Sequence, residues 1–200
     1  AGNPYFTKVF LTSLREEGIL AFEPQSGWTW DASRIVGMAA TESAVALAAL
    51  RISHLPQETR RVVSLAAALG HYFEVETLAT ICGQGAEETE AHLIEACEER
   101  ALLKHGEGYR FEHDQVQEAT YSLIPDEARP ETHLRISRLL RDQAQEDKPA
   151  KIFEIVDHLN RAVSILKSLE EREDVARLNL DAGLKAKGTA AFPSAFQYFS

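Results

Sequence analysis

Histidine and aspartate side chains that could hold a metal ion are the first candidates for chemistry in this sequence. His113 and Asp114 are adjacent, Asp157 and His158 form a similar pair in the opposite order, and His133 lies between the two pairs. Imidazole nitrogens and carboxylate oxygens are common ligands of catalytic metals. Brought together on helices, these five residues would match a metal-dependent phosphohydrolase of the His-Asp type. The further acidic ligands that paired metals need are not evident, so this enzyme class is kept only as an alternative.

Other catalytic patterns are absent from the sequence. The dipeptide Gly-Lys never occurs, which excludes the phosphate-binding loop GxxxxGK[ST], and neither GxSxG nor HExxH is present. Cys82 and Cys97 are the only cysteines, too few for a disulfide framework or a metal cage, which favours a reducing, cytoplasmic setting. We therefore expect no catalytic residue, no metal and no cofactor in this chain by itself.

Composition indicates a folded chain that is soluble in water. It has 200 residues, of which 44% are hydrophobic and 26% charged, and a formal net charge of −10. The longest apolar stretches fall far short of the roughly 20 residues that a bilayer requires, so we expect no membrane contact. No signal peptide opens the sequence, and it begins at Ala1 without an initiator methionine, so we expect a fragment of a longer protein.

The elements that would position these side chains are clearest in the middle of the chain. Periodicity and turn residues predict helices over 57–69, 75–82 and 87–100, a short strand at Tyr72-Phe73, and two strands over 101–104 and 109–112. In chain order this gives a helix, a strand, two helices and a hairpin, which is typical of a winged helix. We assign the winged helix to residues 55–124.

Residues 1–54, before this domain, are predicted as a lid-like helical part. Asn3 and Pro4 are suited to the start of a helix and Gly18 to its end. A hairpin should follow, in which Trp28 and Trp30 lie on one face and are expected in the core.

Residues 125–200, after the domain, are predicted to be helical throughout. The final pair of helices fits the opening of a tetratricopeptide-like (TPR-like) repeat as well as it fits an ordinary helical hairpin. Phe192, Phe196 and Phe199 are expected to pack within that pair and to leave an apolar edge. The fold class is therefore mostly α, with a winged helix and small β-hairpins between a lid-like part and a helical array.

A winged helix raises the possibility of a DNA-binding transcription regulator, and charge argues against it. Residues 87–100, the helix that would enter the major groove, hold six glutamates and one arginine. Such a surface repels phosphates rather than reading base edges. The wing adds only Lys104, His105 and Arg110. We expect no nucleic-acid partner and keep DNA binding as the alternative.

Motifs over nearly the whole chain resemble one class of signalling proteins. They are Gly2-Asn3-Pro4-Tyr5-Phe6, Gly18-Ile19-Leu20, Trp28-x-Trp30-Asp31, Leu55-Pro56-x-x-x-Arg60, Ala66-x-x-Leu69-Gly70, Phe111-x-His113-Asp114-x-Val116-Gln117, Ile152-Phe153-Glu154-Ile155-Val156-x-His158 and Leu178-Asn179-Leu180-x-Ala182-Gly183. Their order and spacing resemble the region downstream of the P-loop core in STAND-class regulatory ATPases, modules of hybrid histidine kinases, Ser/Thr kinases and related regulators.

The resemblance implies roles for four residues. Gly2 and Pro4 would contact the adenine side of a nucleotide, and His113 and Asp114 would approach the β-phosphate of ADP in a closed state. It also implies that ATP or ADP is bound by the parent protein rather than by this chain, whose partners would be an upstream P-loop domain, other domains of the same polypeptide and further proteins. Phe111-Glu112 before the pair departs from the best-known Met-His-Asp form, so the match there is partial.

Overall fold

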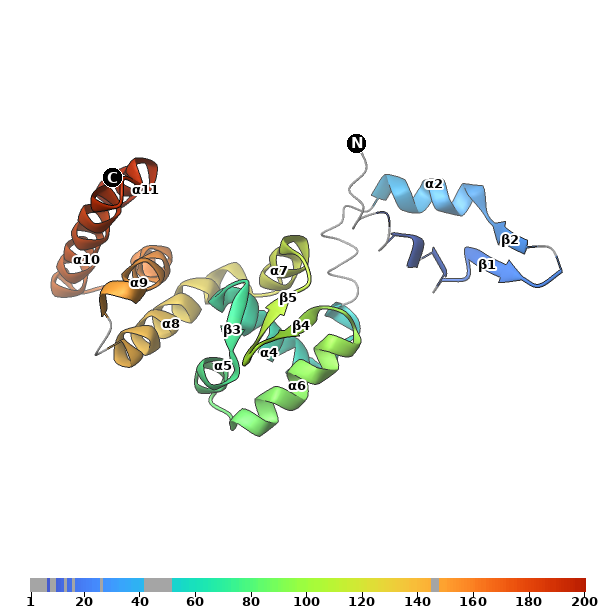
Figure 1. Cartoon of the computed structure of the whole chain (residues 1–200), viewed down its shortest axis with the longest axis horizontal. Coiled ribbons are helices and arrows are strands. Elements are labelled where there is room, and N and C mark those ends of the chain that lie inside the picture. Colours follow the sequence, from blue (N-terminus) through green and yellow to red (C-terminus); the bar gives the residue numbers. More distant parts are fainter. Residues whose placement is uncertain are drawn as a thin grey trace. The chain divides into compact units, whose positions relative to one another are not determined.

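The computed structural model describes residues 7, 10–12, 14, 15, 17–25, 27–41, 52–144 and 148–200. Over these residues the chain is mostly helical with small antiparallel sheets, so the predicted fold class is confirmed at this level (Figure 1). Within the same ranges, no helix combines the length and the apolar character that crossing a bilayer would take.

Two compact units make up the chain. One comprises Ala1–Val75 and Ala86–Leu123, and the other comprises Glu76–Gly85 and Ile124–Ser200. Helix α5 (Val75–Cys82) therefore groups almost entirely with the C-terminal helices, although it lies inside the predicted winged helix in sequence. The predicted boundaries 1–54, 55–124 and 125–200 stay predictions.

The first unit begins with a helical segment, a hairpin and helix α2 (Ala32–Thr41). Gly18 has φ +66°, and Ile19 N donates to Leu14 O at 2.8 Å, which is the helix end that the glycine predicts. The hairpin pairs β1 (Leu20–Glu23) with β2 (Gly27–Trp30) in antiparallel register. Asp31 Oδ1 then accepts from Arg34 N at 3.1 Å and caps α2.

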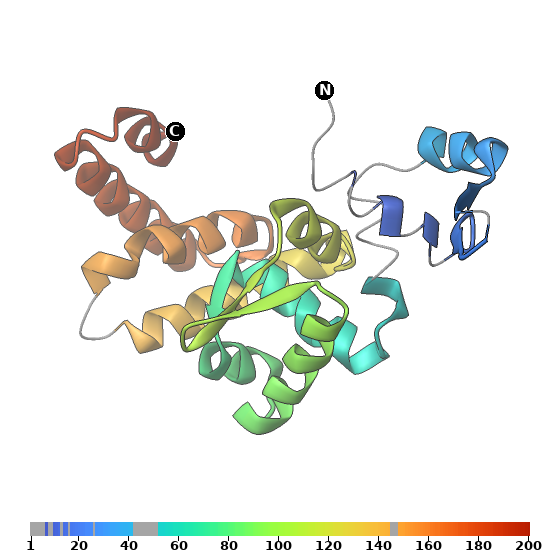
Figure 2. The same cartoon turned by 45° about the vertical axis from the view of Figure 1, so that its right-hand side comes forward.

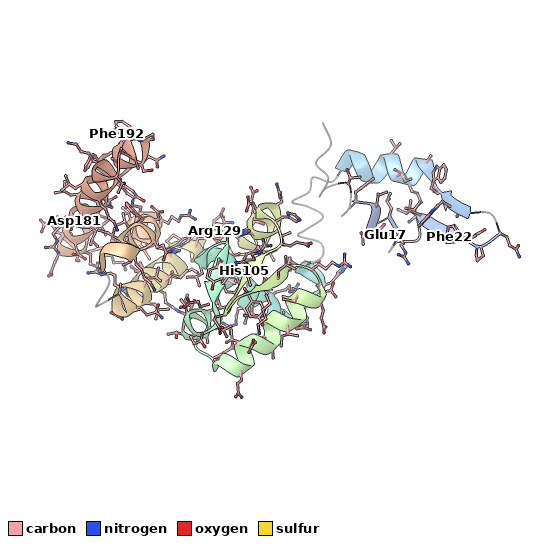
Figure 3. All side chains as sticks on the ribbon, in the orientation of Figure 1. Glu17, Phe22, His105, Arg129, Asp181 and Phe192 are labelled. Atoms are coloured by element: carbon pink, nitrogen blue, oxygen red, sulfur yellow. The ribbon has the colours of Figure 1, made fainter. Side chains whose placement is uncertain are left out.

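The expectation that Trp28 and Trp30 lie in the core is wrong. Their exposed fractions are 54% and 63%, and Phe22, the cross-strand neighbour of Trp28, is 60% exposed (Figure 3). The spacing correctly places both tryptophans on one face of the ribbon. A two-stranded ribbon, however, has no second layer of its own to cover that face.

The predicted order of elements in the middle of the chain is confirmed. It runs α4 (Gln57–Leu69), β3 (Tyr72–Glu74), α5, α6 (Ala86–Glu98), β4 (Leu102–His105), β5 (Gly108–Phe111) and α7 (Asp114–Tyr121). The strands form one antiparallel sheet in the order β3-β5-β4, so β3 pairs with the far strand of the later hairpin (Figure 2).

The core of the first unit lies where α4 contacts α6, α7 and β3. Its largest buried side chains include Tyr109 and Phe111 of β5 and Leu93 of α6. Thr59 of α4 is buried as well, and its hydroxyl lies 2.8 Å from His92 Nδ1 and donates to Glu95 on α6. This polar link joins α4 to α6 within the core.

The second unit contains α5 and the helices that follow Ile124. These are the 3-10 turn η1 (Asp126–Ala128), α8 (Arg129–Gln143), α9 (Lys148–Ala162), the 3-10 turn η2 (Val163–Ile165), α10 (Leu169–Gly188) and α11 (Phe192–Phe199). Each of α8, α9 and α10 contacts the next helix in the chain (Figure 2). Asp174 of α10 also forms an ion pair with Arg141 of α8, with 2.7 Å between the charged atoms. An ion pair therefore joins these helices in addition to apolar packing.

Candidate functional site

The pair His113-Asp114 lies at the start of helix α7, directly after the last strand of the sheet. His113 is the N-cap residue in extended conformation, with φ −150° and ψ 155°, and its carbonyl accepts from Val116 N at 3.0 Å. Its imidazole makes no capping hydrogen bond to the helix. The backbone of His113 therefore begins the helix, and Asp114 is the first residue of the helix.

A second histidine, His71, lies against this pair. His71 Nδ1 is 3.3 Å from Asp114 Oδ1, and His71 O accepts from Phe111 N at 3.0 Å. The pairing of β3 with β5 therefore carries His71 to the start of α7. The sequence offered little to single out His71, since the contact depends on two strands that are far apart in the chain.

The start of α7 has one feature that favours an anion and one that opposes it. The first turn of a helix presents unpaired N–H groups and partial positive charge. The Asp114 side chain, however, is 90% exposed at the same place, so an approaching phosphate would also meet an acidic side chain. His113 can donate a hydrogen bond to an anionic oxygen.

The other two residues assigned by resemblance, Gly2 and Pro4, lie outside the described residues. Their predicted role on the adenine side of a nucleotide stays a prediction.

His133 and His158, from the metal-ligand interpretation, meet inside the second unit. His133 on α8 is 1% exposed and His158 on α9 is 8% exposed, and their Nδ1 atoms are 2.8 Å apart. One Nδ1 must carry the proton and the other must accept it, so the two rings take complementary tautomers. Burial, followed by the positive charges of Arg161 and Arg129, lowers the pKa of His133 to about 4.

The remaining members of that set serve other contacts. Asp157 Oδ1 accepts from Tyr198 Oη at 3.0 Å, and this bond, after burial, raises the pKa of Tyr198 to about 12. Across the ranges that the structure describes, no three His, Cys, Asp or Glu residues gather in a way that could hold a metal ion. The five residues of the metal-ligand interpretation therefore form no described metal cluster.

Comparison with known proteins relates the chain to signal transduction. No family model matches it, and no solved structure matches it. One similar protein is "Hybrid signal transduction histidine kinase G" of Dictyostelium discoideum, which is 23% identical over 254 aligned residues. The alignment takes in 99% of this chain and 7% of the relative, so the chain spans only a small part of that protein.

Proposed function

We propose that this chain is a non-catalytic regulatory part of a multidomain signalling protein of the STAND class. In this proposal it couples the nucleotide state of an upstream P-loop domain to the other domains of the same polypeptide. The parent binds ATP or ADP, is a kinase or ATPase of the cytoplasm, and has protein partners. Distant similarity to a signal transduction histidine kinase over 99% of the chain supports the proposal that this chain is part of a signalling protein.

The proposal interprets residues 55–124 as a winged helix. The order α4, β3, α5, α6, β4, β5 and the sheet order β3-β5-β4 support that interpretation. In a winged helix that binds DNA, α6 would be the helix that enters the major groove.

The acidic character of α6 is the observation that carries the proposal. Its sequence AEETEAHLIEACE contains five glutamates and no lysine or arginine. Such a helix disfavours the phosphate backbone, so a surface for protein domains suits it better than a surface for DNA.

The wing adds little positive charge to this face. Lys104 Nζ on β4 is 3.1 Å from Glu90 Oε1 on α6, and Tyr109 Oη donates to the same oxygen at 3.0 Å. The hydrogen bonds from Lys104 and then Tyr109 hold the pKa of Glu90 below its ordinary value. The wing lysine is therefore engaged with the acidic helix, which further disfavours the DNA-binding alternative.

The start of α7 is the place where this chain would sense the nucleotide. In the ADP-bound, closed state His113 would donate a hydrogen bond to the β-phosphate. Gly2 and Pro4 would contact the adenine side. Exchange of ADP for ATP would remove the contact at His113 and release the winged helix, a switch of the domain-closure kind.

The substitution His113→Ala in the full-length protein tests this proposal. A hydrogen bond to a charged group is worth about 1.5–3 kcal/mol, so we expect ADP to dissociate at least about 10-fold faster. Release of a fluorescent ADP analogue, followed by stopped-flow fluorescence, measures the rate.

The matched control is His54→Ala, which removes an exposed histidine in the same compact unit. It should leave the release of ADP unchanged. Equal release rates for His113→Ala and the unmodified protein would refute the sensing role of His113.

A further inference from the structure

Arg100, just after helix α6, has a strained backbone conformation. Its φ is +57°, in the left-handed region where glycine is the usual residue. Arg100 N donates to Cys97 O and Ala101 N donates to Ala96 O, both at 2.9 Å, which is the Schellman helix end that glycine ordinarily completes. Strained residues cluster at functional sites, so the place of the Arg100 side chain in the fold bears on function.

Arg100 lies at the end of the sheet where helix α7 begins. It directly precedes Ala101, whose carbonyl accepts from Glu112 N at 3.2 Å. His113 directly follows Glu112 and is the N-cap residue of α7. The backbone segments that carry Arg100 and His113 are therefore neighbours across the pairing of β4 with β5, and both belong to the first unit.

The guanidinium of Arg100 forms no ion pair with any residue that the structure describes. The residue is exposed. The arginines that do form ion pairs in this part of the chain are Arg61, Arg129, Arg138, Arg141 and Arg177. A guanidinium carries a permanent charge and can bind a phosphate through two parallel N–H donors. Arg100 therefore offers a cation that the described contacts leave available.

A phosphate at the start of α7 requires such a cation. The exposed carboxylate of Asp114 opposes an anion there. His113 can donate a hydrogen bond, but a neutral imidazole adds no charge. Of these side chains and Arg100, only the arginine is always positive, so it would supply the charge that the histidine alone does not.

We propose that Arg100 is a further nucleotide-binding residue of the parent protein, and that its guanidinium binds the same β-phosphate that His113 approaches. This inference rests on the proposed function, in which His113 contacts ADP. In the closed state the phosphate lies between the residue that follows α6 and the residue that precedes α7. Binding of the phosphate then offsets the strain that an arginine causes at this helix end.

Release of a fluorescent ADP analogue from the full-length protein tests the role of Arg100. Arg100→Gln keeps a long polar side chain and removes the charge, so ADP should dissociate at least about 10-fold faster. Arg100→Lys keeps the charge without the two-donor fork and should give an intermediate rate. Unchanged release from Arg100→Gln, beside faster release from His113→Ala, would overturn this inference and leave the proposed function standing. Unchanged release from both variants would overturn both.

Arg100→Gly separates binding from a purely structural role. Glycine relieves the strain, so the 200-residue chain should keep or raise its melting temperature, followed by circular dichroism, while the full-length protein releases ADP faster. The matched control is Ala190→Gly, since Ala190 has φ +58° in the second unit. It should also keep or raise the melting temperature, but should leave ADP release unchanged.

One pattern of results would assign Arg100 to the helix end alone. A cation at the C-terminus of a helix also interacts favourably with the helix dipole. If that were its whole role, Arg100→Gln would lower the melting temperature and leave ADP release unchanged. That pattern would overturn the inference.

Discussion

At the scale of single residues, the buried pair His133–His158 makes the stability of the second unit depend on pH. The pKa of His133 is lowered from 6.5 to about 4, first by burial and then by two arginines. Between these values the folded imidazole stays neutral while the unfolded one takes up a proton, so acid stabilises the unfolded chain. The free energy of unfolding should be at its full value above pH 6.5 and about 3 kcal/mol lower by pH 4.

Urea unfolding followed by circular dichroism, repeated from pH 7 to pH 4, measures this dependence. The control is His133→Gln, which keeps a side chain that can hydrogen-bond to His158 but cannot titrate. The variant should lose most of the slope between pH 6.5 and pH 4. A slope equal to that of the unmodified chain would show that other groups cause the dependence.

The residues of the candidate site were predictable in part. The predicted strand over 109–112 placed His113 and Asp114 directly after the sheet, and there they lie, His113 as the N-cap residue and Asp114 as the first residue of α7. His71 was missed, because its 3.3 Å contact with Asp114 depends on the pairing of β3 with β5. The metal-ligand alternative grouped His133 with His158, but their direct hydrogen bond was not predicted, because it depends on α8 packing against α9.

At the scale of elements, the end of α10 carries a correctable strain. Ala190 has φ +58°, and Ala191 N donates to Ala186 O at 2.9 Å, a helix end that ordinarily uses glycine at the first of these positions. Ala190→Gly should raise the free energy of unfolding by about 0.5–1 kcal/mol, because glycine adopts positive φ without steric cost.

Chemical denaturation of Ala190→Gly beside Ala176→Gly checks this expectation. Ala176 is an exposed residue in the interior of α10, so glycine there only adds freedom to the unfolded chain and should destabilise by about 0.5–1 kcal/mol. Equal effects of the two substitutions would contradict the assignment of strain to Ala190.

The positions of the helices along the chain were more predictable than the burial of side chains. Helix α4 runs over Gln57–Leu69 and α5 over Val75–Cys82, the ranges that periodicity and the following glycines indicate. Burial was less predictable, as Trp28 and Trp30 show, because alternation fixes which face a side chain takes and not whether another layer covers that face.

At the scale of the whole molecule, the two units differ in the charge of the surfaces they expose. The first unit contains α6, with its five glutamates, and the second contains the uncharged segment Gly188–Ser200 with three exposed phenylalanines. The proposed regulatory role uses α6 and the start of α7 toward other domains of the same polypeptide.

Coupling to a nucleotide requires a difference in affinity between two nucleotide states. A ligand shifts a conformational equilibrium only as far as its binding differs between the states, and typical couplings amount to about 1–3 kcal/mol. Under the proposed function, we therefore expect this chain to bind an upstream nucleotide-binding region more tightly when that region holds ADP.

The most direct test is isothermal titration calorimetry of this chain against that upstream region, loaded either with ADP or with a non-hydrolysable ATP analogue. We expect at least about 10-fold tighter binding to the ADP-loaded form, and we expect His113→Ala to remove most of the difference. Equal affinity for the two loaded forms would contradict this expectation.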